Sequence, residues 1–367
     1  MIKERYVYEP DYAVPPGETL QETIDSLGMT QRELAARTGL TPQTVVRIIK
    51  GEQPVTYGTA NLLELATGVP ARLWNNLEAQ YRERLAKLEE RERMRADLDW
   101  LGSIPVKELQ ARGLVGLHSD KVLVLRDVLA FFGVGSVAAW REIWETPELA
   151  ARRSTCFETC PGSASAWIRQ GELLAHAIPC RPYNRARLVD ALKAIRGLTR
   201  EPAEVFRPEM AARCAEAGVA VVFVQEMKKV PWNGATKWLT PDKAMILLSL
   251  RGKSEDKFWF SFFHEAGHVA RQHKKKELFI NDGTSKDGWE KEADAFAAEF
   301  LIPGKYDAAI CTVRTKAEVT TMADVLGVSP GIVAGRYEFL TGKWSHFKDL
   351  IRRFEWKSAQ KGNTDHA

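Results

Sequence analysis

The chain has few cysteines, no recognisable signal-peptide pattern and little net charge. Its five cysteines are odd in number and irregularly spaced, which argues against a disulfide framework and favours reduced thiols. We find no run of 18 apolar residues and no signal-peptide pattern, so we expect no membrane span and a cytoplasmic location. The formal net charge of +4 favours neither an acidic nor a basic partner for the chain as a whole.

The most informative motif is FFHEAGHVARQ, which places His264 and His268 four residues apart with Glu265 between them. On a helix this spacing stacks both imidazoles on one face, about a turn apart, where they can bind one Zn²⁺. Glu265 would then lie beside the metal as a general base. The run KFWFSFFHEAGHVA has no Pro or Gly before Gly267 and is apolar on most sides, which predicts a helix buried in a domain core.

A catalytic zinc site needs a third protein ligand, and the candidates lie in the downstream segment DGWEKEADAFAAEFLIP. Glu290 and Asp294 are four residues apart, so on a second helix they share a face. We interpret Glu290 as the ligand and Asp294 as the carboxylate that holds a ligand histidine by its other ring N–H. Glu292 is the alternative ligand. It lies about 200° around the helix from Glu290, so only one of the two can point at the metal.

HEAGH followed by WEKEADAFAAEFLIP resembles the ImmA/IrrE family of zinc metallopeptidases, and the upstream GATKWLTPDKAMILLSLRGKSEDKFWF is similar to the same family's core. The resemblance covers roughly residues 200 to 310. It implies a gluzincin-like zinc site. In such a site Glu265 is the base, and the ligands are His264, His268 and Glu290. Family members often carry an amide residue where this chain has Glu292, which favours Glu290 as the ligand. The alternative is a degenerate domain that keeps the helix and has lost its chemistry.

Such a site would hydrolyse a peptide bond. Bound zinc would acidify a water, and Glu265 would take its proton and later return it to the leaving amine. The segment Ala244 to Leu250 is predicted as a strand before the active-site helix, and as an edge to which a peptide substrate could add. The sequence does not select a donor for the oxyanion among His273, Tyr337 and His346.

A second constellation lies in GMTQRELAARTGLTPQTVVRIIKGEQPV, within the first 70 residues. Thr30 and Glu33 form a capping box that opens one helix, and Gly39 supplies the turn. Thr41 and Pro42 then give the N-cap and the first residue of a second helix. Four apolar residues fall where a helix-turn-helix buries its elbow: Ala35, Leu40, Val45 and Ile48.

The outward faces of these two helices carry side chains of the types that reach base edges and phosphates in a major groove. They are Gln43, Thr44, Arg47 and Lys50 on the second helix, with Arg32 and Arg37 on the first. The alternative is a helical hairpin that only packs. The turn glycine, both caps and the outward polar set together favour DNA binding.

The segment from PPGETLQETIDSLGMTQ through LATGVPARLWNNLEAQY looks like the Xre-type DNA-binding domain of HigA-like antitoxins. The resemblance implies a repressor of its own promoter that also binds a toxin. Residues 1–80 contain seven Lys or Arg against ten Asp or Glu, a net of −3 that gives poor non-specific attraction to phosphate. From Arg32 to Lys50, however, four basic residues face one Glu, and dimerisation on a palindrome would double those contacts.

Two further patterns are weaker. Four apolar residues form a stripe through an otherwise charged segment, namely Leu77, Tyr81, Leu85 and Leu88. They predict a solvated connecting helix, and the alternative is a short dimer seam. Four apolar residues at this spacing do not establish a coiled coil. MADVLGVSPGIVAGR, residues 322–336, has the residue pattern of another helix-turn-helix. A packing hairpin beside the active site is the better interpretation.

At 367 residues the chain exceeds one ordinary core, so we expect two or three domains in an α+β protein that is mostly α with a small sheet. The predicted segments are an all-α Xre-type helix-turn-helix domain (1–80), a connecting helix and helical middle region (81–204), an ImmA/IrrE-like zinc metallopeptidase core (205–310) and a C-terminal helical extension (311–367).

These observations predict a cytoplasmic, homodimeric transcription regulator that binds operator DNA, with its own promoter as the expected operator. Its zinc endopeptidase would cleave a repressor or another regulatory protein. The alternative is a HigA-like antitoxin and autorepressor whose metallopeptidase-like domain binds a partner such as a toxin, or senses, without hydrolysis. The intact base and ligands favour the enzyme.

Overall fold

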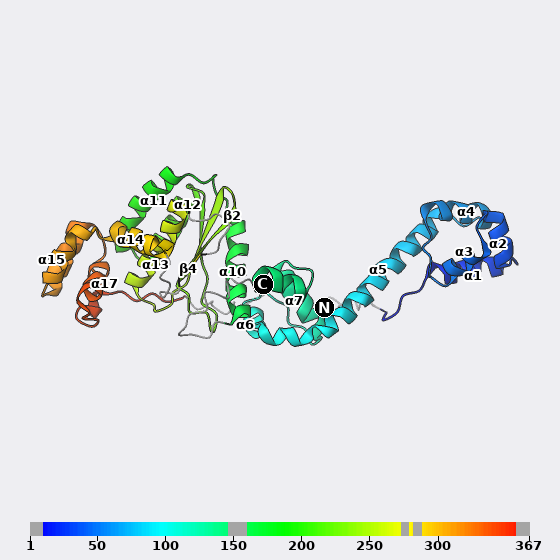
Figure 1. Ribbon diagram of the computed structural model, residues 1–367, viewed down its shortest axis with the longest axis horizontal. Helices are drawn as coiled ribbons and strands as arrows, with labels where there is room; N and C mark the ends of the chain where they lie inside the picture. Colours follow the sequence, from blue (N-terminus) through cyan, green and yellow to red (C-terminus); the bar gives the residue numbers. More distant parts are fainter. Residues whose placement is uncertain (1–9, 146–159, 273–278, 282–287, 357–367) are drawn as a thin grey trace, which may run out of the picture. The chain divides into compact units, whose positions relative to one another are not determined.

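The structure is a computed structural model that describes residues 10–145, 160–272, 279–281 and 288–356 (Figure 1). Its contacts divide the chain into two compact units, Met1–Asp99 with Ser119–Arg126 and Trp100–His118 with Asp127–Ala367. Helices dominate both units, and a sheet lies in the second. The predicted fold class, mostly helical with a small sheet, is confirmed, while the division into four segments stays a prediction.

Five helices build the first unit: α1 (Pro16–Ser26), α2 (Gln31–Thr38), α3 (Pro42–Ile49), α4 (Tyr57–Thr67) and α5 (Ala71–Ala96). The side chains of Thr30 and Thr41 cap α2 and α3, each accepting a hydrogen bond from the backbone N–H three residues on. The reciprocal half of the predicted capping box is not formed, because the Glu33 side chain pairs with Arg37 instead. Gly39 ends α2 at φ +70°, a conformation that glycine adopts without strain. The predicted elbow residues Val45 and Ile48 are buried in the core of this unit.

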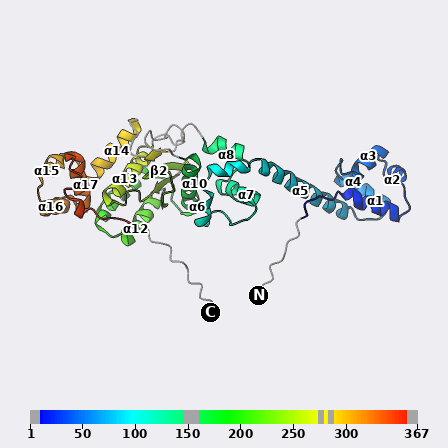
Figure 2. The same ribbon diagram turned by 90° about the horizontal axis from the view of Figure 1, so that it is seen from below.

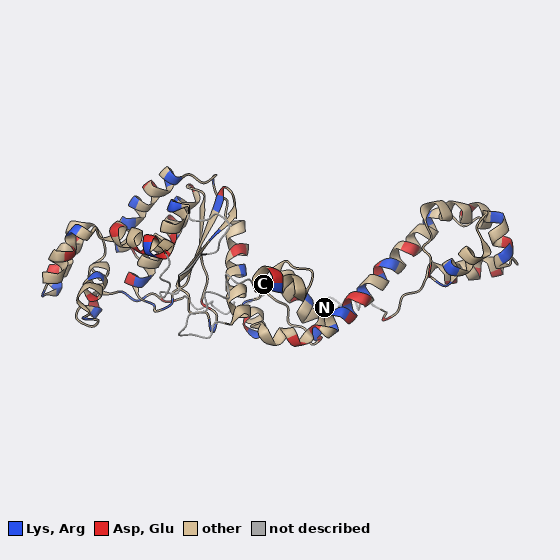
Figure 3. Ribbon diagram, viewed as in Figure 1, with Lys and Arg blue, Asp and Glu red and all other residues tan. Residues whose placement is uncertain are grey.

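Helix α5 is the predicted connecting helix. Its first turns belong to the core of the first unit, where Trp74 is fully buried and Leu77 packs against the same cluster. Beyond them Tyr81, Leu85 and Leu88 are half-buried, and Figure 3 shows charges of both signs along the helix. The stripe is therefore a partly covered face on a charged helix, and a dimer seam remains a prediction.

One apolar region bears on the expectation that no segment of the chain spans a membrane. The region Lys121–Trp144 is long and apolar enough to cross a membrane, judged by length and composition alone. It consists of two helices, α7 (Lys121–Phe132) and α8 (Val137–Trp144), which have 12 and 8 residues. At 1.5 Å per residue neither approaches the hydrocarbon thickness of about 30 Å. Trp140 and Trp144 are also buried within the protein, so this region is weak evidence for a span.

Four strands form the sheet of the second unit: β1 (Val219–Phe223), β2 (Gly234–Thr240), β3 (Lys243–Leu248) and β4 (Phe279–Asn281). Their order is β1-β3-β2-β4, with β1 parallel to β3 and the other pairs antiparallel. The prediction that Ala244 to Leu250 forms a sheet edge is wrong, because β3 lies between β1 and β2. Its continuous apolar run, fully buried from Ala244 to Leu248, is typical of a strand covered on both faces.

Helices cover both faces of this sheet. The helices around the sheet in this unit are α6 (Val106–Ala111), α10 (Pro161–Ala177), α11 (Arg185–Gly197), α12 (Ala203–Ala215), α13 (Glu255–Arg271) and α14 (Gly288–Leu301). Of these, α10, α12 and α13 contact its strands. Figures 1 and 2 show α10 on one face and α13 on the other. A Cβ on Gly171 of α10 would lie 2.7 Å from the Leu247 side chain, so this glycine lets α10 lie close to β3. Helix α13 packs against β2, β3 and α14, which buries the HEAGH motif.

Three short helices close the chain: α15 (Asp307–Thr312), α16 (Lys316–Leu326) and α17 (Pro330–Thr341). Gly327 in the left-handed region and Ser329 as N-cap form the turn between α16 and α17. The fully buried carboxylate of Glu255, at the start of α13, accepts hydrogen bonds from Ser329 Oγ (3.0 Å) and from Arg352. Residues 322–336 are thus the predicted packing hairpin, anchored on the helix that carries the HEAGH motif.

Candidate metal centre and DNA-reading helix

The two histidines of the HEAGH motif lie together inside the protein. Helix α13 runs unbroken from Glu255 to Arg271, so the four-residue spacing places His264 and His268 on one face. Their Nε2 atoms are 3.1 Å apart, and the side chains are 2% and 1% exposed. Two imidazole nitrogens that converge inside the protein are a donor arrangement that suits a metal ion.

Glu290 of α14 completes the group. Its Oε2 atom lies 3.0 Å from His264 Nε2 and 3.6 Å from His268 Nε2. Ligands bound tetrahedrally to zinc at about 2.0 to 2.1 Å would be about 3.3 Å from one another. The three contact distances bracket that value, so one ion fits with a coordination position left over. Among the described residues, His264, His268 and Glu290 are the one group of three such ligands.

The two other carboxylates on α14 have different roles. Asp294 Oδ1 is 2.8 Å from His264 Nδ1, so the far ring nitrogen donates to it while Nε2 faces the other ligands. This is the arrangement predicted for Asp294, and it selects the tautomer that a metal needs. Glu292 lies on the exposed side of α14 and pairs with Arg271 at 3.5 Å. The structure thus directs Glu290, and not Glu292, toward the histidines.

Burial and hydrogen bonding act in opposite directions on the pKa values of His264 and Glu290. Burial lowers the pKa of His264, but hydrogen bonds to Asp294 and Glu290 outweigh it and raise that pKa to about 10. For Glu290, burial raises the pKa, while the hydrogen bonds from His264 and His268 outweigh it and hold the pKa well below the usual range. The surroundings therefore favour an anionic Glu290 beside a cation, the charge pattern that a bound metal ion also satisfies.

Glu265 is fully buried and held against β2. Its Oε2 accepts a hydrogen bond from Thr236 Oγ1 at 2.6 Å. A Cβ on Gly234 would lie 2.8 Å from Glu265 Oε1, so only glycine leaves room for this carboxylate. The sequence interpretation missed both β2 residues. Strand pairing brings them to α13 from about 30 positions away, and no local pattern in the sequence marks them.

A cavity of about 910 Å³ opens onto the centre and reaches His264, Glu290 and Asp294. Its apolar walls come from α13, α14 and α17, with Phe260, Leu301, Ile302, Ile332 and Phe339 among them. Its cationic lining residues are Arg251, Lys257 and Arg336. Such a mixed cleft beside a metal centre has room for several residues of a peptide.

Two of the three candidate oxyanion donors, Tyr337 and His346, do not line this cavity. Tyr337 is buried and stacks on His346 with ring centroids 5.8 Å apart, and neither residue lines the cavity. Both therefore have a packing role in this structure. His273 lies outside the described residues.

The predicted DNA-reading residues lie on α3 and α2. Gln43, Arg47 and Lys50 are exposed along α3, as predicted. The Thr44 side chain is half-buried, and its hydroxyl lies 2.9 Å from the hydroxyl of the cap residue Thr41. Thr44 thus already takes part in holding the helix start, which limits what its hydroxyl can offer to a base.

On α2, Arg32 is exposed. Arg37 pairs with Glu33 at 2.6 Å across one helical turn. An exposed pair of this kind contributes little to stability, so it can open at low cost when a phosphate competes for the guanidinium. Both arginines remain available as the phosphate contacts that the sequence suggests.

The fold and the two sites define a helix-turn-helix DNA-binding regulator joined to a metallopeptidase-type domain. Residues 20–74 match the helix-turn-helix family HTH_3, and residues 217–338 match the peptidase M78 family, described as the IrrE N-terminal-like domain. Over 63 residues the chain is 32% identical to the uncharacterized HTH-type transcriptional regulator YddM of Escherichia coli (strain K12). That stretch is 17% of this chain and 67% of the relative. The chain belongs to the HTH-type transcriptional regulators.

Proposed function

We propose that this protein is a DNA-binding regulator whose second unit is a zinc endopeptidase acting on a repressor or another regulatory protein. The observation that carries the proposal is the triangle of His264, His268 and Glu290 atoms, with separations of 3.0 to 3.6 Å beside the buried carboxylate of Glu265. An acidic base next to three metal ligands, with a cleft beside them, is the arrangement that metal-assisted peptide hydrolysis needs.

Each residue has a definite part in this mechanism. His264, His268 and Glu290 would hold the zinc, which supplies Lewis acidity that polarises a peptide carbonyl and acidifies a water. Asp294 keeps the ring of His264 in the tautomer whose Nε2 can bind the metal. Glu265 accepts the proton of the attacking water and later delivers it to the leaving amine. Thr236 and the space above Gly234 fix the direction of that carboxylate.

The partners follow from the first unit. We propose that α3 enters the major groove of an operator in the promoter of the protein's own gene, with Gln43 and Arg47 at base edges. Arg32, Arg37 and Lys50 would contact phosphate, and Thr44 would approach the backbone beside the helix start. A homodimer would place two such helices on a palindrome. A regulator of this kind works in the cytoplasm.

A second candidate function has one observation in its favour. Glu265 is fully buried and engaged by Thr236, and it is not among the residues that line the cavity. A domain that binds or senses without hydrolysis, as in a HigA-like antitoxin and autorepressor, would keep its base in that state. Hydrolysis instead requires the carboxylate to turn toward the water once metal and substrate are bound.

Cleavage assays on matched proteins separate the two candidates. Purified wild type and Glu265→Gln are assayed for zinc and incubated with the repressors and toxin-like proteins encoded beside the gene. We expect both proteins to hold about one zinc, and the substitution to lower the cleavage rate by about 10² to 10⁴ because an amide cannot accept the proton. Cleavage at equal rates by both proteins would show that Glu265 is not the base. Zinc-loaded wild type that binds a partner and never cuts it would establish the binding function.

A further inference from the structure

In the part of the chain that the structure describes, no strand pairs with the outer edge of β1. In β1 the residues that bond to β3 are even-numbered, since Gly218 O accepts from Ala244 N and Val224 N donates to Leu248 O. The alternate residues Val221 and Phe223 therefore direct their N–H and C=O groups away from β3, beyond the edge. No hydrogen bond to those outward groups is found among the described residues. An open ladder edge is a template for another strand.

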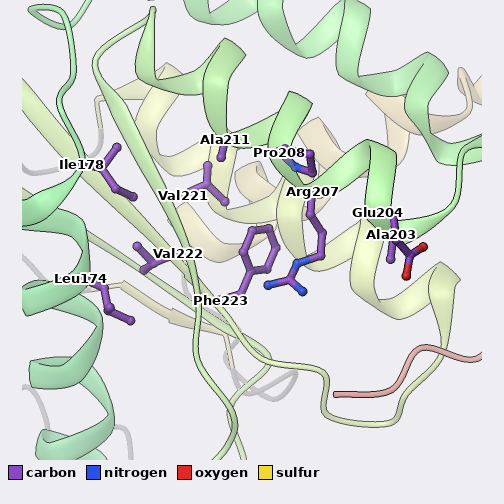
Figure 4. A pocket seen from close by; sticks show the side chains of 10 residues that line it. All are labelled: Leu174, Ile178, Ala203, Glu204, Arg207, Pro208, Ala211, Val221, Val222 and Phe223. Atoms are coloured by element: carbon purple, nitrogen blue, oxygen red, sulfur yellow. The ribbon is translucent and has the colours of Figure 1, made fainter. Parts of the chain in front are cut away.

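Two helices form walls along this edge and leave a cavity of about 520 Å³ between them (Figure 4). One wall is the end of α10, which contributes Leu174, 45% exposed, and continues into Ile178. The other wall is one face of α12, whose residues follow the helical spacing i, i+3, i+4 and i+7: Glu204, Arg207, Pro208 and Ala211. Figure 4 shows Val222 on the side of Leu174 and Phe223 on the side of Arg207.

Arg207 places a positive charge in this groove. Its guanidinium lies over the ring of Phe223, 4.7 Å from the centroid, which holds the cation at the open edge of β1. The side chain is exposed, and in the described part of the chain it forms no ion pair. Glu204 lies one turn earlier on the same wall. A ligand that runs along the edge therefore meets a cation at the level of Phe223.

We propose that this groove binds a short extended segment of a partner protein, which adds to β1 as a fifth strand. Side chains alternate across a strand, so one set would contact the apolar surface of Val222, Leu174 and Ile178. The other set would face α12 and carry an acidic residue opposite Arg207. The groove shares no lining residue with the metal cavity, so it holds a partner whether or not that partner is cleaved.

The experiment selects ligands and then localises them. A phage-displayed library of random linear heptapeptides is selected on the full-length chain carrying Glu265→Gln, so that no probe can be hydrolysed. We expect enriched peptides with apolar residues at alternate positions and one Asp or Glu among the rest. Fluorescein-labelled copies of the best peptide are then titrated by fluorescence polarisation.

Charge reversal tests the contact with Arg207. Arg207→Glu should weaken peptide binding at least tenfold, and exchanging the peptide's acidic residue for Lys should restore binding to that variant. Arg213→Glu, the same change on the outer side of α12, should leave binding unchanged; Arg213 pairs with Glu209 and does not line the groove. If circular dichroism shows that Arg207→Glu is misfolded, Arg207→Gln replaces it, with a smaller loss expected.

Strand addition is tested on the peptide, which leaves the protein unaltered. N-methylation of every second peptide amide should abolish binding in one of its two phases and be tolerated in the other, because only alternate N–H groups face β1. Tolerance of both phases would rule out strand addition. Failure to enrich any peptide would overturn the proposal, as would peptides whose affinity is indifferent to Arg207→Glu.

Discussion

The DNA-reading helix and the metal centre are both recognised from residues spaced along a helix, yet the structure treats their side chains in opposite ways. On α3, Gln43 and Arg47 are exposed. On α13 and α14, the three candidate ligands are at most 3% exposed and contact one another. The proposed reading face would thus be completed only by DNA, whereas the fold already assembles the candidate metal centre.

The difference has an energetic origin. A buried polar or charged group is costly unless it is hydrogen-bonded or paired, so the side chains of the candidate centre need partners within the protein. Asp294 and Thr236 do this for His264 and Glu265. Exposed side chains are already solvated by water, so replacing one changes stability little and its effect shows only in binding. Substitutions in the two regions should therefore fail in different assays.

The largest expected effect is loss of the metal. His264→Ala or His268→Ala removes one of three protein ligands, and zinc content should fall from about one per chain to near zero. The same proteins should still bind the operator with wild-type affinity in mobility-shift titrations. Glu290→Gln should also weaken zinc binding strongly. The assignment fails if Glu292→Gln loses the metal while Glu290→Gln keeps it.

Next in size is the support of His264. Asp294→Ala should lower zinc affinity by about 10- to 100-fold, because the ligand ring loses the carboxylate that fixes its orientation. Competition with a chelator measures this change. Glu292→Ala is the matched control, since it removes a carboxylate of similar exposure from the same helix, and we expect no change in affinity. Equal losses in both variants would indicate a general effect of charge on α14.

For DNA, Gln43→Ala or Arg47→Ala should cost about 1 to 3 kcal/mol in specific binding and relax selectivity at particular base pairs. Lys50→Ala should instead weaken binding to all sequences and reduce the salt slope by about 0.9, as expected for one phosphate contact. Mobility-shift titrations over a salt series measure both effects. Equal affinity for the gene's own promoter and for scrambled DNA would leave the helices as a protein-docking module.

The smallest expected effect is local. Thr41→Ala removes the side chain that caps α3 and should lower the stability of the first unit by about 1 kcal/mol. Thermal unfolding followed by circular dichroism reports this change, and zinc content should be unaltered. A loss of zinc in this variant would contradict the separation of the two regions that the comparison implies.

The sequence interpretation was most accurate where a function depends on neighbours within one or two turns. The caps at Thr30 and Thr41 and the turn at Gly39 lie where their local patterns indicate. The match to the peptidase family confirms the resemblance drawn from the HEAGH segment. The strand at Ala244 was assigned to an edge because an apolar run reports burial and is silent about which strands flank it.

The sequence by itself determined the helices, the residue types of both sites and the spacing that places each set on one helix face, because those properties depend on a period of 3.6 residues. Only the tertiary structure decided the rest. It selects Glu290 over Glu292 by the side on which α14 packs against α13, and it brings Thr236 to Glu265 through the pairing of β2 with β3. It also stacks Tyr337 on His346, and neither residue lines the cavity. These outcomes depend on contacts between residues far apart in the chain, which local periodicity does not encode.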